Sequence, residues 1–228
     1  MKIYFATENL GKLREVEAIL KKILPQCELF SVHDLTPKEK ENYIAEEIGV
    51  TYAQNALIKA QSLAHALSMP ATSFIHPWIL DDAKTASMPA TSFIHPWILA
   101  EDSGFEVLSL NGEPGVYSAR FAPNDKERIQ KVLQLLQGKP RRARFVSCVT
   151  LLENGKNPIY FFGRKEGIVA EVPRGKDGFG YDPIFIPEGA SKTWGEVTKE
   201  EKNVDSHRSR AFRLAAEYIL SSMSQHSL

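Results

Sequence analysis

The sequence has little cysteine, no net charge and no long apolar run, and each absence excludes a class of protein. The only two cysteines, Cys27 and Cys148, argue against a disulfide scaffold or a structural zinc site and favour a reducing compartment. Lys plus Arg, 28, equal Asp plus Glu, 28, so no net field attracts nucleic acid or an anionic membrane surface. No segment approaches the roughly 18 apolar residues of a membrane span, and the N-terminal apolar stretch is too short for a signal peptide. We expect a cytoplasmic protein without nucleic-acid or membrane partners.

Apolar periodicity predicts a mixture of strands and helices within one domain, residues 1–228. Hydrophobic residues make up 43% of the chain, enough for a sizeable core. Alternating and helical apolar spacings predict strands at 2–6, 105–110, 143–152 and 159–162, and helices at 11–23, 52–67 and 124–137 and from Ser206 onward. Asn154-Gly155 favours a type I′ turn between two antiparallel strands. This order predicts an α/β protein built on a mixed sheet.

A tandem duplication interrupts this pattern. The thirteen residues SMPATSFIHPWIL occur at 68–80 and again at 87–99. Only the second copy leads into the acidic residues Glu101 and Asp102, so we expect a strand at Ile98–Ala100 and treat residues 72–97 as an insertion. We also expect the polar tail, residues 221–228, to be frayed.

Two segments place charge beside turns. Residues 7–12, TENLGK, follow the first strand and precede a helix, where free backbone N–H groups and Lys12 favour an anion such as phosphate. Glu101-Asp102-Ser103-Gly104 offers two carboxylates at a predicted strand end before a tight turn, ligands for a hard divalent ion, with Glu46 and Glu47 as further acids. Neighbouring strand residues point to opposite faces, so the two acids of this segment do not share one task. A plain structural turn and solvated carboxylates are the alternatives.

Two later segments combine glycines, aromatic residues and cations. Residues 174–183, RGKDGFGYDP, permit close backbone approach, and Phe179 or Tyr181 could stack on a base. Lys202 and the pair His207-Arg208 precede or open the last helix, where they could receive an anion. An ordinary glycine-rich loop and a solvated helix start explain these segments about as well.

Six motifs taken in order resemble the inosine triphosphate pyrophosphatase family, also called Ham-type or non-canonical purine NTP pyrophosphatases. They are ATENLGK at 6–12, YAQNALIKA at 52–60, AEDSGFEV at 100–107, PGVYSARFA at 114–122, RGKDGFGYDPIF at 174–185 and EEKNVDSHR at 200–208. The resemblance runs over nearly the whole chain.

The resemblance implies an elongated mixed β-sheet flanked by helices, with two lobes and a central nucleotide cleft, in a homodimer. It also implies Mg²⁺-dependent hydrolysis of ITP, dITP or XTP to the monophosphate and pyrophosphate. In this family Asp102 would be the general base and a metal ligand, with Glu47 as the second metal-binding acid. The implied substrate-binding residues are Thr7, Glu8, Asn9, Leu10, Gly11, Lys12, Ser103, Phe179, Gly180, Tyr181, Asp182, Lys202, His207 and Arg208.

Two departures from the family pattern bear on activity. Gln54 stands where the motif usually has Glu, and the insertion lies directly upstream of the proposed base. Loop closure costs only about 0.6 kcal/mol per doubling of length, so we expect folding to survive. The alternatives are a nucleotide-binding protein of the same fold whose activity the insertion impairs, and a related pyrophosphatase acting on other modified nucleotides.

Overall fold

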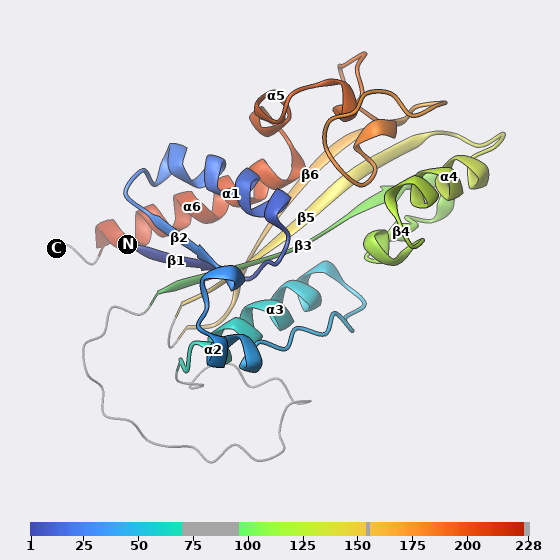
Figure 1. The fold of residues 1–228 in the computed structure, drawn as a ribbon. Helices are drawn as coiled ribbons and strands as arrows, with labels where there is room; N and C mark the ends of the chain where they lie inside the picture. The colour runs from blue at the N-terminus through green and yellow to red at the C-terminus, as the bar shows by residue number, and fades with distance from the viewer. Residues whose placement is uncertain (70–95, 154–155, 226–228) are drawn as a thin grey trace.

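The computed structural model describes residues 1–69, 96–153 and 156–225, drawn in colour in Figure 1. Its strands are β1 (Lys2–Phe5), β2 (Glu28–Ser31), β3 (Trp97–Val107), β4 (Pro114–Gly115), β5 (Arg142–Leu152), β6 (Ile159–Val169) and β7 (Phe185–Pro187). Its helices are α1 (Leu10–Ile23), α2 (Pro37–Asn42), α3 (Tyr52–Ala66), α4 (Asp125–Leu135), α5 (Lys199–Val204) and α6 (His207–Gln225).

All of these strands belong to one mixed sheet. Its order is β2-β1-β3-β5-β6-β7, with β4 added beside β3. β1 runs parallel to β2 and β3, and the remaining pairs are antiparallel. The predicted α/β class with an elongated mixed sheet is confirmed.

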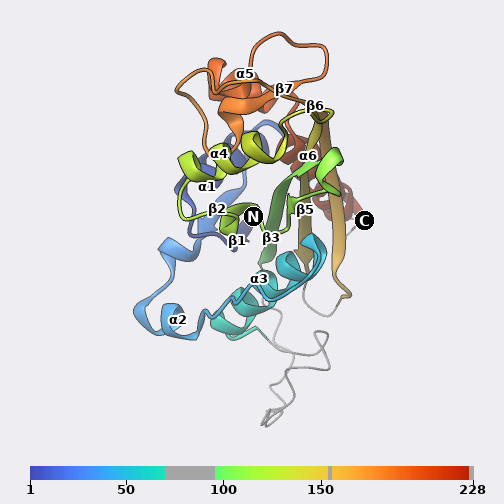
Figure 2. The ribbon, with the colours of Figure 1, turned by 90° about the vertical axis from the view of Figure 1, so that its right-hand side faces the viewer.

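Helices cover both faces of this sheet, α1 and α6 on one and α3 on the other (Figures 1 and 2). Leu99 packs with the α1–α6 layer, whereas its neighbours Ile98 and Ala100 pack with α3. A separate aromatic core at the far end of β3 and β5 includes Phe145 and Trp194. The long central strands therefore connect two halves that have separate cores.

Strand β3 has an interrupted edge. β5 pairs with it from Ile98 to Val107 along one edge, so β1 and β4 share the other. β1 pairs only with Trp97–Leu99, and β4 only with Phe105 and Glu106. Within the described part of the chain, residues 100–104 have no strand neighbour on that second edge. This gap leaves the edge open beside the acidic motif.

The tight turn predicted after Glu101 and Asp102 is wrong, because β3 continues through Val107 without a break. Pairing with β5 through the whole segment holds it extended. Gly104 serves close packing instead: a Cβ there would clash with the Gly115 carbonyl and lie 2.6 Å from the Tyr52 hydroxyl. The strand predicted at 105–110 ends at Val107, and residues 108–110 form a 3₁₀ turn.

Most predicted elements are present, with shifted ends. The antiparallel β5–β6 pair is confirmed, while the Asn154-Gly155 turn lies outside the described residues. Helix α6 continues through Gln225, beyond the predicted start of fraying, and Ser222 is buried on it. The helix is therefore longer than predicted. Ile98–Ala100 is strand as predicted, whereas the first copy of the repeat from residue 70 onward lies outside the described residues.

Candidate functional site

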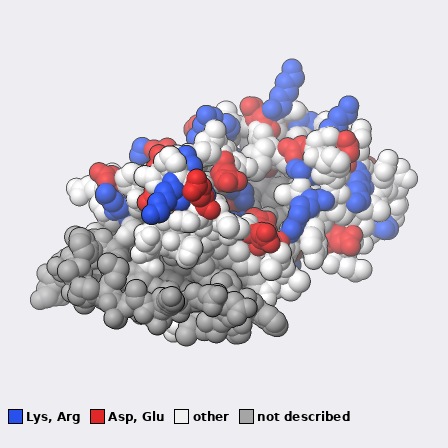
Figure 3. Space-filling view, turned by 60° about the horizontal axis from the view of Figure 1, so that its bottom comes forward, with Lys and Arg blue, Asp and Glu red and all other residues white. Residues whose placement is uncertain are grey.

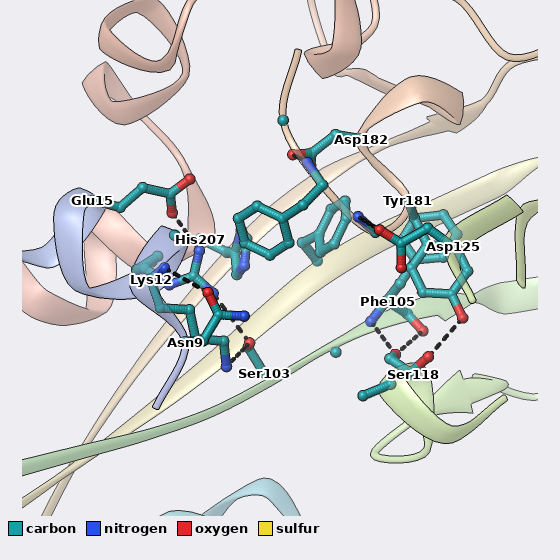
Figure 4. A pocket seen from close by; sticks show the side chains of 18 of the residues that line it. Asn9, Lys12, Glu15, Ser103, Phe105, Ser118, Asp125, Tyr181, Asp182 and His207 are labelled. Atoms are coloured by element: carbon teal, nitrogen blue, oxygen red, sulfur yellow. Dashed lines mark hydrogen bonds and ion pairs between the residues drawn. The ribbon is translucent and has the colours of Figure 1, made fainter. Parts of the chain in front are cut away.

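A cavity of about 470 Å³ opens beside the free edge of β3 and is lined from both halves of the molecule (Figure 4). Most of the predicted substrate-binding residues line it: Asn9, Gly11, Lys12, Ser103, Phe179, Gly180, Tyr181, Asp182, Lys202, His207 and Arg208. Thr7, Glu8, Leu10, Asp102 and Glu47 do not. With Ser118 and Ala119 also in the lining, the structure brings residues of five of the six motifs together in one cavity.

The turn before α1 supplies one end of the cavity. The Asn9 side chain caps the helix by accepting a hydrogen bond from the Lys12 backbone N–H at 3.0 Å. Thr7 is buried, and its hydroxyl accepts from the Asn9 N–H at 3.2 Å, so it shapes the turn without lining the cavity. Glu8 and Leu10 are exposed outside the cavity. Lys12 Nζ reaches the β3 edge, 3.2 Å from both Ser103 Oγ and Glu101 Oε2.

Arg208 is the centre of a buried ionic network. Its guanidinium donates to Glu101 Oε1 at 2.9 Å, to Glu15, and to Ser103 Oγ at 3.3 Å. Burial alone would raise the pKa of Glu101, but Arg208 and Lys12 outweigh it and hold that pKa well below its usual range. Glu101 is therefore ionised at any physiological pH.

Lys202 extends this network to the loop at residues 178–182. Its ammonium lies 2.7 Å from Asp182 Oδ2 and 3.5 Å from Glu15 Oε1. It also lies 4.8 Å from the centre of the Phe179 ring, a cation–π contact. Burial raises the pKa of Asp182, and Lys202 opposes that rise. The loop at residues 178–182 is thus held to the start of the C-terminal helices.

His207 presents an unpartnered nitrogen in a buried position. Its ring stacks on Phe145 at 4.8 Å and on Trp194 at 5.5 Å, and Nδ1 has no hydrogen-bond partner. Burial, reinforced by the charge of Arg208, keeps the pKa of His207 well below its usual value. The imidazole is therefore neutral at pH 7, and its free nitrogen can donate or accept a hydrogen bond with a ligand, depending on the tautomer.

Tyr181 forms a fixed aromatic wall. Its ring stacks on Phe105 at 4.8 Å, and its hydroxyl donates to the Ser118 carbonyl at 2.9 Å. The Ser118 hydroxyl in turn accepts from the Phe105 N–H at 2.8 Å. Tyr181 is therefore tied to β3 by both packing and hydrogen bonds.

The predicted metal-binding acids meet on the opposite face of β3, outside the cavity. Lys59 Nζ lies 2.7 Å from Glu47 Oε1 and 3.6 Å from Asp102 Oδ1. Asn55 Nδ2 donates to Asp102 Oδ2 at 3.0 Å, and Arg120 donates to the Glu47 carbonyl at 2.8 Å. Burial raises the pKa of Asp102, while Lys59 and Lys12 oppose the rise.

These acids offer two carboxylates to a divalent cation. Within residues 1–69, 96–153 and 156–225, no three Asp, Glu, His or Cys side chains come together as metal ligands. Glu47 and Asp102 nevertheless both approach the Lys59 ammonium, so their carboxylates converge on one position. Mg²⁺ commonly binds one or two carboxylates and completes its shell with substrate phosphates and water. The two carboxylates therefore fit Mg²⁺ in the presence of a phosphate ligand.

Sequence reasoning missed Glu15, Asn55, Lys59 and Arg120. Asn55 and Lys59 are four residues apart on α3 and so share a face, a signal that was available in the YAQNALIKA motif. Glu15 interrupts the apolar face of α1 and is buried there. No local pattern pointed from Arg120 to Glu47.

Gln54 preserves the local structure despite its departure from the family pattern. Its Oε1 accepts from the Val50 N–H at 2.9 Å and from the Thr51 N–H at 3.1 Å, completing a capping box at the start of α3. The amide replaces the carboxylate in this role.

Comparison with known proteins agrees with the resemblance. The family model described as the Ham1 family matches residues 3–218. A dITP/XTP pyrophosphatase of Staphylococcus epidermidis is 35% identical over 221 residues, 95% of each chain. Another, of Deinococcus deserti, is 38% identical and is matched over 92% of this chain and 85% of its own. A HAM1 protein from Coxiella burnetii has a solved structure with a TM-score of 0.75 at 31% identity, covering 97% of this chain and 99% of its own.

The motifs occur in the family's order and several converge on one cavity, and relatives above 30% identity align over most of the chain. The chain therefore belongs to the Ham1 family.

Proposed function

We propose that the chain hydrolyses non-canonical purine nucleoside triphosphates, ITP, dITP or XTP, to the monophosphate and pyrophosphate with Mg²⁺. The names of the relatives as dITP/XTP pyrophosphatases support this activity. The observation that carries the proposal for this chain is the position of Lys12. Its ammonium lies at the free edge of β3, between the aromatic cavity on one face and the carboxylates on the other.

The cavity suits a purine that carries a 6-oxo group. Phe179 and Tyr181 offer ring faces for stacking, and neutral His207 with the neighbouring cations offers hydrogen-bond donors. A 6-amino group would present another donor to these groups. An unpaired buried polar group costs about 1–3 kcal/mol, so adenine nucleotides should bind less well.

The triphosphate would extend from the cavity across the open edge of β3. The Asn9–Lys12 turn and Ser103 would bind its oxygens on the way. At the far side Glu47 and Asp102 would hold Mg²⁺ together with the phosphates. When bound, Mg²⁺ neutralises phosphate charge and stabilises the charge that develops in the transition state.

Asp102 is the proposed general base. Asn55 and the Ser103 backbone N–H, the latter at 3.0 Å, fix its carboxylate. Burial brings its pKa nearer to neutrality than that of an exposed aspartate, which suits proton acceptance from the attacking water. The proton moves from that water to a carboxylate oxygen of Asp102.

A substrate panel tests the assignment. Pyrophosphate release should be measured from ITP, dITP, XTP, GTP and ATP with Mg²⁺ present, and again with excess chelator. We expect release from the first three, much slower release from GTP and ATP, and loss of activity with chelator. Equal rates on all five nucleotides would reject the proposed base recognition.

We further propose a cytoplasmic homodimer without nucleic-acid partners. Exposed Tyr160 and Phe162 on β6 would supply apolar contact area for a second copy. The face in Figure 3 mixes acidic and basic side chains instead of gathering one sign, which disfavours a nucleic-acid surface. No helix in the described ranges is both long and apolar enough to span a membrane. Sedimentation analysis of the chain would test the dimer.

A further inference from the structure

Helix α4 begins at the rim of the cavity and contacts the base-binding loop. Asp125, its first residue, accepts a hydrogen bond from the Gly180 backbone N–H through Oδ2 at 2.8 Å. The other oxygen, Oδ1, pairs with Arg128 Nη1 at 2.7 Å, and Arg128 Nε donates to the Ala122 carbonyl at 2.9 Å. Figure 4 shows Asp125 beside Tyr181, away from Lys12 and Glu15.

The loop at 178–182 depends on such contacts because its glycines do not by themselves favour one backbone conformation. Gly178 and Gly180 have φ values of +77° and +62°, the left-handed region in which glycine is conformationally free. Asp182 holds the loop from inside, since its Oδ2 accepts from the Phe179 N–H at 2.9 Å. Asp125 holds it from outside, from a helix 55 positions earlier in the chain.

The Asp125 contact falls between two aromatic residues of the cavity. Tyr181 is fixed by Phe105 and Ser118, whereas Phe179 contacts the side chains of Lys202 and Arg208 across the cavity. Gly180 is the residue between them, so its position sets where Phe179 lies relative to Tyr181. The residues proposed to hold phosphate and metal come from other elements.

We propose that Asp125 is a positioning residue that fixes Gly180 and thereby sets the geometry of the base-binding slot. This proposal rests on the proposed function. Under this proposal Asp125 affects the affinity for the purine base, but neither phosphate binding nor the chemical step. Its side chain is 49% exposed, and Arg128, which is 19% exposed, keeps the Ala122 carbonyl as a partner when Asp125 is removed.

The test compares Asp125→Ala, Asp125→Asn and Glu127→Ala with the unmodified chain, by steady-state kinetics on ITP and by inhibition with inorganic tripolyphosphate. Asp125→Ala should raise the KM for ITP about tenfold, the equivalent of one charge-assisted hydrogen bond, with kcat changed less than about twofold. Asp125→Asn keeps an acceptor oxygen and should restore KM to within about threefold. Inhibition by tripolyphosphate should be unchanged. Glu127→Ala removes a carboxylate of the same helix turn that does not touch the loop, and it should match the unmodified chain.

Several outcomes would overturn the proposal: an unchanged KM in Asp125→Ala, a parallel weakening of tripolyphosphate inhibition, or an equal rise in KM for Glu127→Ala. If the unmodified chain hydrolyses none of the nucleotides, the proposed function fails, and calorimetric binding of ITP replaces KM as the readout. A tenfold weaker binding to Asp125→Ala would then still support the positioning role, and equal binding would reject it. Should Asp125→Ala fold poorly by circular dichroism, Asp125→Ser serves in its place with the same expected results.

Discussion

Glu101 and Asp102 are neighbours on one strand and almost equally buried, at 2% and 5% exposure, yet their environments differ in kind. Glu101 faces the α1–α6 layer, where Arg208, Lys12 and Ser147 all contact its carboxylate. Asp102 faces α3, where the nearest cation, Lys59, lies 3.6 Å away and is shared with Glu47. Burial acts to raise the pKa of both carboxyl groups. At Glu101 the cations outweigh burial and the pKa is lowered, whereas at Asp102 they do not and the pKa stays raised.

Burial alone therefore does not determine whether a carboxylate stays charged or can accept a proton. Glu101 is held permanently charged and organises the cations of the base-binding side. Burial leaves the pKa of Asp102 raised, which is consistent with its proposed role as proton acceptor. One strand thus supplies a structural charge to one face and the proposed general base to the other.

The largest expected effect comes from removing the reactive carboxylate. Asp102→Asn should lower kcat for ITP by about 10²–10⁴-fold, the usual contribution of a general base, because the amide cannot accept the proton. The thermal midpoint should stay close to that of the unmodified chain, since the amide retains the hydrogen-bonding shape. Ser103→Ala, which removes one proposed phosphate contact but no proton acceptor, should lose far less activity. Full activity of Asp102→Asn would remove Asp102 from the mechanism.

Neutralising the other carboxylate should act on stability. Glu101→Gln removes one of the two carboxylates that pair with buried Arg208. Breaking a buried ion pair typically lowers the free energy of unfolding by about 3–5 kcal/mol. Because the folded-state pKa of Glu101 lies below the ordinary value of 4.5, its contribution is fully present above that pH. The contribution is lost as pH falls toward the folded pKa. Urea unfolding should therefore show that Glu101→Gln has a lower free energy of unfolding than the unmodified chain at neutral pH, and that this difference is smaller at pH 4. An equal difference at both pH values would contradict a lowered pKa of Glu101.

A smaller effect is expected from the cation beside Asp102. Lys59 favours the ionised carboxylate, so Lys59→Gln should raise the pKa of Asp102 further and move the acid limb of the kcat profile to higher pH. Activity falls on the acid side because protonated Asp102 cannot act as a base. Lys59→Arg keeps the charge and should leave the midpoint near that of the unmodified chain. A midpoint that stays fixed or moves down in Lys59→Gln would show that another group controls this limb.

The sequence predicted the local features of this molecule well. The helices predicted from residues 11, 52 and 124 begin at Leu10, Tyr52 and Asp125, where side chains within four residues cap them. The antiparallel pairing of β5 with β6 followed from two adjacent apolar runs. The cavity residues could be predicted because they lie in motifs whose order along the chain resembles that of the family.

What the sequence concealed depends on partners far along the chain. Glu15 and Arg208 are 193 positions apart, and nothing near either one indicates the other. The continuity of β3 through Gly104 requires β5, which lies about forty positions later, so a local pattern suggested a turn. Strand alternation did predict that Glu101 and Asp102 face opposite sides, whereas the open edge of β3 beside them is a feature of the assembled sheet.

Asp102 and its neighbours are proposed to cleave a triphosphate whose base lies on the other side of β3. The most direct test incubates the unmodified chain with dITP and Mg²⁺ and identifies the products by phosphorus NMR. The account predicts dIMP and pyrophosphate in equal amounts. Formation of dIDP and orthophosphate, or tight binding of dITP without turnover, would contradict it.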